Sequence, residues 1–385
     1  MKILVLNYEY PPLGGGAGVI TKHISEGLAQ MGHEVTVVTT WFQDLERFEE
    51  IGNLKIFRLK AKRKYSYKST VFEMRSWIRV SKTFLTKYFL ENISDLCFAN
   101  FALPGGEVAL YLKKRFDIPY VIISHGHDIP WYCRDEMFKY HMVTYPWIKK
   151  ICMDSLVNFV QTGEMKDNID KFLGPGHVRK NVMIPNGCDI KLFKKDSSKL
   201  TSEFRILFTG RFVKQKDPFT LLKALRILDE RNINFSAHFI GDGVLKKEMI
   251  GFVKENKLID KIKFSGWITK VKIIEEYQSS YVFVQSSLYE AMSIAVMEAL
   301  ACGTYIIATP VGMNKELISE GVTGDWFTPG NAEELAEKLI RFYNEKFLKS
   351  ETVDESLVEK FRKKYDWENI LEKYDKVLTA LVDKH

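Results

Sequence analysis

Two acidic residues, Glu290 and Glu298, flank a short apolar segment in the second half of the chain. Strand-like runs at 281–285 and 304–309 precede and follow this segment. Ser293 is a good N-cap, so we expect a helix that starts after Glu290 and carries Glu298 about one to two turns inside. Ionised carboxylates only accept hydrogen bonds, so an exposed pair suits a ligand rich in hydroxyl donors, such as a sugar and a ribose. The alternative is a capping carboxylate and a solvated helix residue.

Two cations, Arg211 and Lys216, follow a strand-like run at 205–209. A departing diphosphate gains negative charge in the transition state of a transfer reaction, and fixed cations stabilise that charge. Two cations this close together could serve such a leaving group. Taken singly, each cation is better explained as a solvated surface residue.

A glycine-rich loop at 14–18 lies between the first predicted strand and the first predicted helix. Glycines let the backbone approach an oxyanion, and the helix N-terminus adds positive potential. A dinucleotide-binding pattern fails, because Val19 takes the place of its third glycine and no acidic residue ends the second strand. A Walker motif also fails, since no Lys-Ser/Thr pair follows the glycines. A plain tight turn remains the alternative to phosphate binding.

The segment Ser124-His125-Gly126-His127-Asp128 ends an apolar strand. Two histidines and an aspartate so close together suggest a metal site, yet no other His/Cys cluster in the sequence completes one. A packed or turn-forming histidine is the other alternative. We expect no metal here.

Taken together, these motifs resemble the retaining glycosyltransferases of the GT-B fold, and most closely family 4, the group 1 glycosyl transferases. The resemblance rests on the E-x7-E signature with the Cys302-Gly303 stop, the G-R-x4-K pattern at 210–216 and the N-G-C-D turn at 186–189, in the family's order. It covers nearly the whole chain and implies an α/β protein with two Rossmann-like domains whose parallel sheets face each other across a cleft.

The resemblance also implies a role for each motif. His125 would bind the donor sugar at the transfer point, and Glu290 would contact the sugar's hydroxyls. Arg211 and Lys216 would hold the diphosphate, and these four residues are the expected catalytic group. Further donor-binding positions are expected at Gly15, Gly16, Gly241, Ile268, Met292, Ser293, Ile294 and Glu298, the last on the ribose. Asp128 is expected to contact the acceptor.

One departure from the family's pattern concerns the loop beside the donor sugar. Ala291-Met292-Ser293 stands where the family often has Gly-Phe-Gly, so the identity of the sugar stays open.

Strand-like and helix-like segments alternate in two series, which favours two parallel sheets. In the first, strands at 2–7 and 34–40 enclose a helix and form a βαβ unit. The polar segment 194–203 is interpreted as the linker. We expect an acceptor-binding domain at 1–195, a donor-binding domain at 196–363 and, from the resemblance, a final helix at 364–385 that packs back on the first domain.

The composition fits a globular protein of two domains: 385 residues, 46% hydrophobic and 27% charged, with a net charge of +7. The five scattered cysteines favour reduced thiols. No apolar run reaches the roughly 18 residues that span a bilayer. Met1 leads directly into a predicted strand, so we expect no secretory signal and a cytoplasmic protein.

The stretch 60–87 carries nine Lys and Arg residues against a single acid, Glu73, with aromatic residues interleaved. Such a stretch can lie on an anionic membrane surface at the inner face of a membrane. A solvated helical face over the core of the first domain is the alternative.

The expected reaction is metal-independent transfer of a sugar from a UDP- or GDP-type nucleotide sugar to a hydroxyl of a glycan, lipid or small metabolite, with retention. No cofactor besides this co-substrate and no nucleic-acid partner are expected. The alternatives are a GT-B sugar phosphorylase or a nucleotide-sugar epimerase. More distant ones are a non-catalytic membrane- or nucleic-acid-binding protein and an NAD-dependent oxidoreductase.

Overall fold

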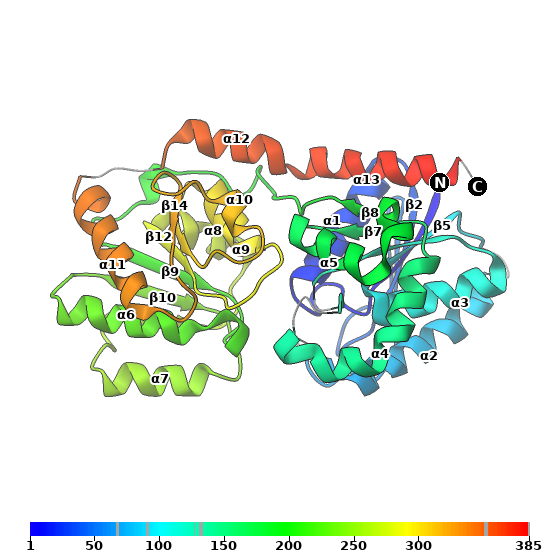
Figure 1. The fold of residues 1–385 in the computed structure, drawn as a ribbon, viewed down its shortest axis with the longest axis horizontal. Helices are drawn as coiled ribbons and strands as arrows, with labels where there is room; N and C mark the ends of the chain where they lie inside the picture. Colours follow the sequence, from blue (N-terminus) through cyan, green and yellow to red (C-terminus); the bar gives the residue numbers. More distant parts are fainter. Residues whose placement is uncertain (67–68, 90–91, 127, 131–133, 350–352, 384–385) are drawn as a thin grey trace. The chain divides into compact units, whose positions relative to one another are not determined.

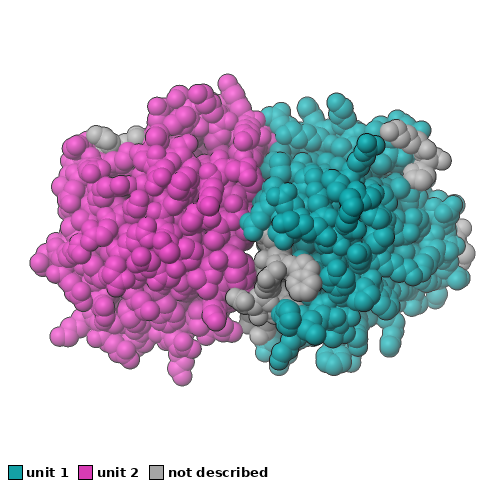
Figure 2. Space-filling view, viewed as in Figure 1, with its two compact units in different colours: residues 1–187, 367–385 teal, residues 188–366 magenta. Residues whose placement is uncertain are grey.

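The computed structural model describes residues 1–385 except 67–68, 90–91, 127, 131–133, 350–352 and 384–385, and leaves out the side chains of 134–137. His127, Cys133 and Lys68 therefore lie outside the described residues. The chain divides into two compact units (Figure 2). Unit 1 comprises Met1–Gly187 and Trp367–His385, and unit 2 comprises Cys188–Asp366.

The described part of unit 1 contains an eight-stranded sheet in the order β3-β4-β2-β1-β5-β6-β7-β8, parallel except for the β3–β4 pair. Strands such as β5 and β6 are buried at every position, as expected of a parallel sheet covered on both faces. The strands are β1 (Lys2–Leu6), β2 (Glu34–Thr40), β3 (Phe48–Ile51), β4 (Leu54–Leu59), β5 (Leu96–Asn100), β6 (Tyr120–Ile123), β7 (Asn158–Val160) and β8 (Asn181–Met183).

Helices alternate with these strands along the chain (Figure 1). They are α1 (Gly16–Gln30), α2 (Val71–Tyr88), α3 (Glu107–Phe116), α4 (Arg134–Asp154), α5 (Gly163–Leu173) and α13 (Trp367–Val382), with short turns η1 (Phe101–Gly106) and η2 (Pro175–Lys180).

Unit 2 contains, among its described residues, a six-stranded parallel sheet in the order β11-β10-β9-β12-β13-β14. Its strands are β9 (Arg205–Thr209), β10 (Ser236–Ile240), β11 (Ile262–Ser265), β12 (Val282–Gln285), β13 (Tyr305–Ala308) and β14 (Gly324–Trp326). Its helices are α6 (Pro218–Glu230), α7 (Lys246–Glu255), α8 (Lys270–Ser279), α9 (Ile294–Ala301), α10 (Asn314–Leu317), α11 (Ala332–Phe342) and α12 (Glu355–Tyr365), with short turns η3 (Ser197–Lys199), η4 (Lys214–Lys216) and η5 (Tyr343–Phe347).

The two faces of the unit 2 sheet have separate cores, because successive strand residues point to opposite faces. Ile206 and Phe208 of β9 belong to a core with α6, α7 and α11. Leu207, between them, belongs to the opposite core with Tyr277 of α8 and Leu300 of α9. The alternation places α8 and α9 together on one face of the sheet (Figure 1).

The polar segment 194–203, predicted to be the linker, lies inside unit 2, and the chain passes between the units at Gly187–Cys188. The segment lacks apolar periodicity, and polar contacts hold it in place. Nζ of Lys195 lies 3.1 Å from the carbonyl oxygen of Val353, and its aliphatic stem packs against Gly303. The polarity of the segment 194–203 therefore did not identify the boundary between the two units.

The last helix, α13, packs on α1 within unit 1. The rings of Trp367 and His23 are stacked with centroids 4.9 Å apart, and Nε2 of His33 lies 2.6 Å from Oδ1 of Asp375. A Cβ added at Gly27 would lie 2.2 Å from a methyl carbon of Leu371, so glycine permits the close approach of the two helices.

Each sheet has a point at which the direction of the strand order reverses. In unit 1 it lies between β1 and β5, and in unit 2 between β9 and β12. Open parallel sheets bind ligands just beyond the carboxyl ends of the strands at such points. The residues that follow these four strands are therefore the candidates for function.

Candidate active site

The loop after β9 carries Arg211 and Lys216, at the reversal point of unit 2. Gly210 and Gly241 lead out of the neighbouring strands β9 and β10 with φ of +145° and +140°. A Cβ at Gly241 would lie 1.9 Å from the carbonyl oxygen of Gly210, so this position accepts no side chain. The predicted Gly241 thus lies beside the loop that carries the two cations.

Lys216 and Glu290 form an ion pair, although they are 74 residues apart in sequence. Each side chain is only 16% exposed. Gln215 links the same two loops: its Oε1 accepts from Nη2 of Arg211 at 3.2 Å, and its Nε2 donates to the carbonyl oxygen of Tyr289 at 3.2 Å. The cations expected on the diphosphate and the carboxylate expected on the sugar therefore form one hydrogen-bonded group.

Ser293 is the N-cap of α9, as predicted, and its side chain accepts from the amide of Val296. Gln285, the last residue of β12, donates to the Ser293 hydroxyl, and Nδ2 of Asn314 donates to Oε1 of Gln285 at 2.8 Å. Met292 is buried at 6% exposure, and Ile294 is the first residue of the helix. A buried polar network therefore fixes the start of α9.

Glu298 lies inside α9, and its Oε2 accepts from the hydroxyl of Tyr277 at 3.1 Å. Burial raises the pKa of Glu298 to about 7, against the opposing effects of this hydrogen bond and of Lys270. Both carboxylates are partly buried: Glu290 pairs with Lys216, and Glu298 accepts from the buried Tyr277. Their contacts with a ligand stay a prediction. Ile268, half-buried, packs against the same core as Tyr277.

In unit 1, Gly15 is the N-cap of α1 and Gly16 its first residue, and both are exposed. The first turn of this 15-residue helix contains no acidic side chain. The amide of Gly14 is already used, since it donates to the carbonyl oxygen of Ser66 at 2.8 Å. The helix N-terminus at Gly15 and Gly16 therefore has the electrostatic character that an anion prefers.

His125 follows β6, and its Nε2 lies 3.0 Å from the amide oxygen of Asn100, the last residue of β5. Because that oxygen only accepts, Nε2 carries the hydrogen and donates it. Oγ1 of Thr21 lies 2.7 Å from the same oxygen, and Nδ2 of Asn7 donates to Oγ1 of Thr21 at 2.6 Å. Burial lowers the pKa of His125 to about 3, so the ring is neutral.

The Asp128 carboxylate holds the backbone around His125. Its Oδ1 accepts from the amide of His125 at 3.0 Å, and its Oδ2 accepts from the amide of Ala102 at 2.9 Å. Burial raises the pKa of Asp128, and these amides oppose the rise. In this geometry Asp128 orients the His125 loop, and a contact with an acceptor stays a prediction.

The stretch 60–87 does not form a single solvated helical face. Helix α2 begins only after Thr70, where Thr70 and Glu73 form a capping box. The Arg63 side chain is 2% exposed: it pairs with Glu9 at 3.5 Å and lies over the ring of Tyr8. Lys82 pairs with Glu107 of α3. Arg63 thus packs against Tyr8 and Glu9, and it also donates to the carbonyl oxygen of Ser66, which accepts from the amide of Gly14.

Three residues that hold the site were not predicted: Asn100, Gln285 and Tyr277. Asn100 and Gln285 each end a buried strand at a reversal point, and a polar residue at the end of an apolar strand was the available signal. Tyr277 gave no such signal, since a tyrosine on an amphipathic helix is usually a core residue.

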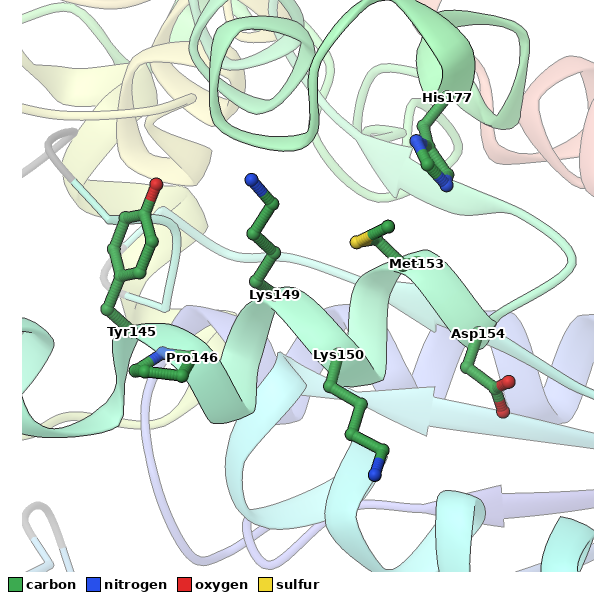
Figure 3. A pocket seen from close by; sticks show the side chains of 7 residues that line it. All are labelled: Tyr145, Pro146, Lys149, Lys150, Met153, Asp154 and His177. Carbon is green, nitrogen blue, oxygen red and sulfur yellow. The ribbon is translucent and has the colours of Figure 1, made fainter.

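A pocket of unit 1 is lined by seven other residues (Figure 3). Its lining comes from α4, with His177 of η2 opposite. None of the predicted site residues belongs to it. In the described residues, no group of three or more His, Cys, Asp or Glu side chains is placed to hold a metal ion.

Comparison with known proteins gives full-length matches. An uncharacterized glycosyltransferase of Methanocaldococcus jannaschii is 26% identical over 384 residues, which cover 96% of each chain. Sucrose-phosphate synthase from Thermosynechococcus elongatus has a similar structure, with a TM-score of 0.86 at 20% identity over 100% of both chains. Anabaena HepE in complex with UDP-glucose matches with a TM-score of 0.78 at 18% identity, over 99% of this chain and 100% of that one.

The structural matches confirm the predicted α/β fold of GT-B type. The family model for glycosyltransferase family 4 matches residues 14–192, and the model for glycosyl transferases group 1 matches residues 189–364. Since the two matches together span residues 14–364, the chain belongs to the group 1 glycosyl transferases of family 4.

Proposed function

We propose that this protein transfers a sugar from a UDP- or GDP-type nucleotide sugar to a hydroxyl of a glycan, lipid or small metabolite, with retention of anomeric configuration. The observation that carries the proposal is the hydrogen-bonded group of Arg211, Gln215, Lys216 and Glu290 at the reversal point of unit 2. The complex of HepE with UDP-glucose supports a donor of this class.

In the proposed reaction, the bond between the anomeric carbon and the donor phosphate oxygen breaks. The acceptor oxygen bonds to the same face of that carbon, and the acceptor proton passes to the departing phosphate. Arg211 and Lys216 stabilise the negative charge of the diphosphate, a task that a divalent ion performs in other enzymes. When Lys216 turns to phosphate, the Glu290 carboxylate can accept hydrogen bonds from the sugar.

Neutral His125 donates through Nε2 to Asn100, and this bond fixes the orientation of its ring. Its backbone is fixed in turn by Asp128. The proposed role of His125 is to contact the donor sugar from a rigid support, with its carbonyl oxygen near the developing positive charge. Gly15 and Gly16 are proposed to lie over the diphosphate.

The first test is thermal stabilisation by UDP, GDP, ADP and TDP, without metal and then with magnesium. We expect one diphosphate to raise the melting temperature by several degrees, because a ligand that binds only the folded state stabilises it. The stabilisation should be lost in Arg211→Ala and Glu298→Ala. Absence of any shift in the wild-type protein would contradict the proposal.

Activity assays distinguish this proposal from the two alternative activities. A sugar phosphorylase would turn over an oligosaccharide with inorganic phosphate and without nucleotide. A nucleotide-sugar epimerase would convert a nucleotide sugar without any acceptor. Release of free UDP or GDP that depends on an added acceptor would exclude both.

A basic and partly apolar surface of unit 1 supports a second proposal, contact with an anionic membrane. Lys62 and Lys64 are exposed ahead of α2, and Phe72 in its first turn is 78% exposed. On α4, Val143 is 81% exposed and Trp147 is 54% exposed. Exposed aromatic and aliphatic side chains beside lysines are typical of surfaces that lie on lipid.

The glutamate of α3 connects the two helices that form this surface. Glu107 accepts from Nζ of Lys82 on α2 and, at 2.6 Å, from Nε1 of Trp147 on α4. Lys82 of α2 and Trp147 of α4 therefore contact the same side chain of α3. In the described residues, no helix is long and apolar enough to cross a bilayer.

Charge reversal tests this surface. We expect the wild-type protein to co-sediment with phosphatidylglycerol vesicles at low salt, and Lys62→Glu/Lys64→Glu to lose this binding, because exposed charges act on an anionic surface through a screened field. Lys247→Glu/Lys254→Glu on α7 makes the same change of charge on unit 2 and serves as the control. Equal binding by all three proteins, or none by the wild type, would contradict the proposal.

A further inference from the structure

Tyr277 of α8 lies behind the donor group of unit 2, and the proposed reaction has so far given it no role. Its hydroxyl oxygen is 3.1 Å from Oγ1 of Thr209 and 3.1 Å from Oε2 of Glu298. The residue is only 1% exposed, and its ring makes edge contacts with Phe193 and Phe283 at centroid distances of 6.0 and 5.7 Å. Aromatic packing therefore holds the hydroxyl at a fixed place between two functional elements.

The chemistry of the three groups sets the direction of the hydrogen bonds. The Tyr277 hydroxyl donates its hydrogen to Oε2 of Glu298. The phenolic oxygen then accepts from the hydroxyl of Thr209, which can donate. The chain Thr209, Tyr277, Glu298 occupies Oε2 of the carboxylate and leaves Oε1 as the acceptor for a ligand.

Thr209 ends β9, two residues before Arg211. Glu298 comes from α9, whose start is fixed by Gln285 and Ser293. The phenol therefore connects the strand that leads into the diphosphate loop with the helix that carries the ribose-binding carboxylate. Rigid support of this kind decides how precisely a binding group faces its ligand.

We propose that Tyr277 is a positioning residue for the donor: it orients the Glu298 carboxylate toward the ribose hydroxyls and fixes its place relative to the diphosphate loop. The inference rests on the proposed function, because it takes a nucleoside diphosphate as the ligand. Tyr277 itself makes no contact with the ligand in this proposal.

The decisive variant is Tyr277→Phe, which keeps the ring and removes only the hydroxyl. We expect its dissociation constant for UDP or GDP, measured by calorimetry, to rise by about 10- to 150-fold, the effect of losing one hydrogen bond to a charged group. The matched control is Tyr305→Phe. Tyr305 is also a buried tyrosine of unit 2, 3% exposed, and its hydroxyl donates to a carboxylate oxygen of Asp325 at 3.0 Å.

A nucleotide without ribose hydroxyls separates positioning from general destabilisation. For 2′,3′-dideoxy-UDP or its guanosine counterpart, Tyr277→Phe and the wild-type protein should bind equally, because Glu298 then has no hydroxyl to accept from. Equal weakening for the normal and the dideoxy nucleotide would show a merely structural role and overturn the inference. So would unchanged binding of the normal nucleotide.

If Tyr277→Phe does not fold, Thr209→Val offers a second test, because it removes the hydroxyl that donates to the phenol. It should weaken UDP or GDP binding in the same ribose-dependent way, and a ribose-independent effect or none would overturn the inference. Failure of the proposed function looks different: the wild-type protein itself would then bind neither UDP nor GDP.

Discussion

For Glu298, the position in the sequence and the state of ionisation depend on different information: the first is read from the spacing of residues, and the second depends on the folded surroundings. Its position eight residues after Glu290 was sufficient to predict it as a site residue. Its ionisation was not predictable, because it depends on burial and on neighbours that are distant in sequence. Burial raises the pKa of Glu298, Asp189 adds to this effect, and the two together outweigh the lowering by Tyr277 and Lys270.

The raised pKa has a consequence for stability that can be measured. Folding favours protonated Glu298, so its contribution to the free energy of unfolding is present below the unfolded pKa and is lost as pH rises through about 7. Glu298→Gln is neutral at every pH and avoids that loss. Without nucleotide, its melting temperature relative to the wild type should therefore increase between about pH 5 and about pH 8, by an effect of order 1–3 kcal/mol.

The control for this titration is Glu276→Gln. The hydrogen bond with His238 lowers the pKa of Glu276, so this pKa shifts in the opposite direction to that of Glu298. That variant should instead lose stability relative to the wild type above the unfolded pKa of a glutamate. Parallel melting curves of Glu298→Gln and wild type across this range would refute the burial of the carboxyl group.

At the residue scale, the sequence allowed candidate side chains to be predicted but not the partners that they contact in the structure. Lys216 and Glu290 were assigned to different parts of a ligand, yet they pair with each other. Arg63 was grouped with the solvated lysines, yet it is buried against Tyr8 and Glu9. These pairings join distant segments, and single-sequence reasoning has no access to them.

At the scale of elements, strands and helices with a clear apolar pattern were predictable. β1, β2 and β9 lie within one residue of their expected ranges, because buried parallel strands are continuous apolar runs. β3 and β14 were missed. β3 is an edge strand with one intermediate and three exposed residues, and β14 has only three residues, so neither has a readable pattern.

The turn between β10 and the following loop offers a test at this scale. Gly241→Ala places a Cβ against the carbonyl oxygen of Gly210, at a φ that side chains rarely adopt. We expect a loss of about 1–3 kcal/mol in the free energy of unfolding and weaker nucleotide binding, because the backbone beside Arg211 must shift. Chemical denaturation and calorimetry with UDP or GDP measure the two effects.

Gly251→Ala is the matched control, since a Cβ at this position within α7 meets no atom within 4 Å. Alanine favours a helix, so this variant should be neutral or more stable by up to about 1 kcal/mol. Equal behaviour of the two variants would mean that the contact between Gly210 and Gly241 does not constrain the site.

At the scale of the whole molecule, the two units differ in how the chain builds them. Unit 1 is discontinuous: its core includes Ile370, Tyr374 and Leu378 of α13, all buried. Unit 2 is a single continuous segment, 188–366. The predicted boundaries at 195/196 and 363/364 differ by a few residues from these limits: the chain passes between the units at 187/188 and 366/367, where Gly187 lies against the ring of Trp367.

The continuity of unit 2 leads to the last prediction. Both cores of its sheet consist of residues between 188 and 366, and so do Arg211, Lys216, Glu290 and Glu298. Residues 188–366 expressed alone should therefore unfold cooperatively and bind the same nucleoside diphosphate as the whole protein. The reason is that folding of unit 2 and binding of the donor nucleotide would require only contacts within this unit. They should transfer no sugar, since His125 and the glycine loop belong to unit 1. Circular dichroism melting, calorimetry and an acceptor-dependent assay check the three parts separately, and a soluble, folded segment that fails to bind the nucleotide would place essential donor contacts outside unit 2.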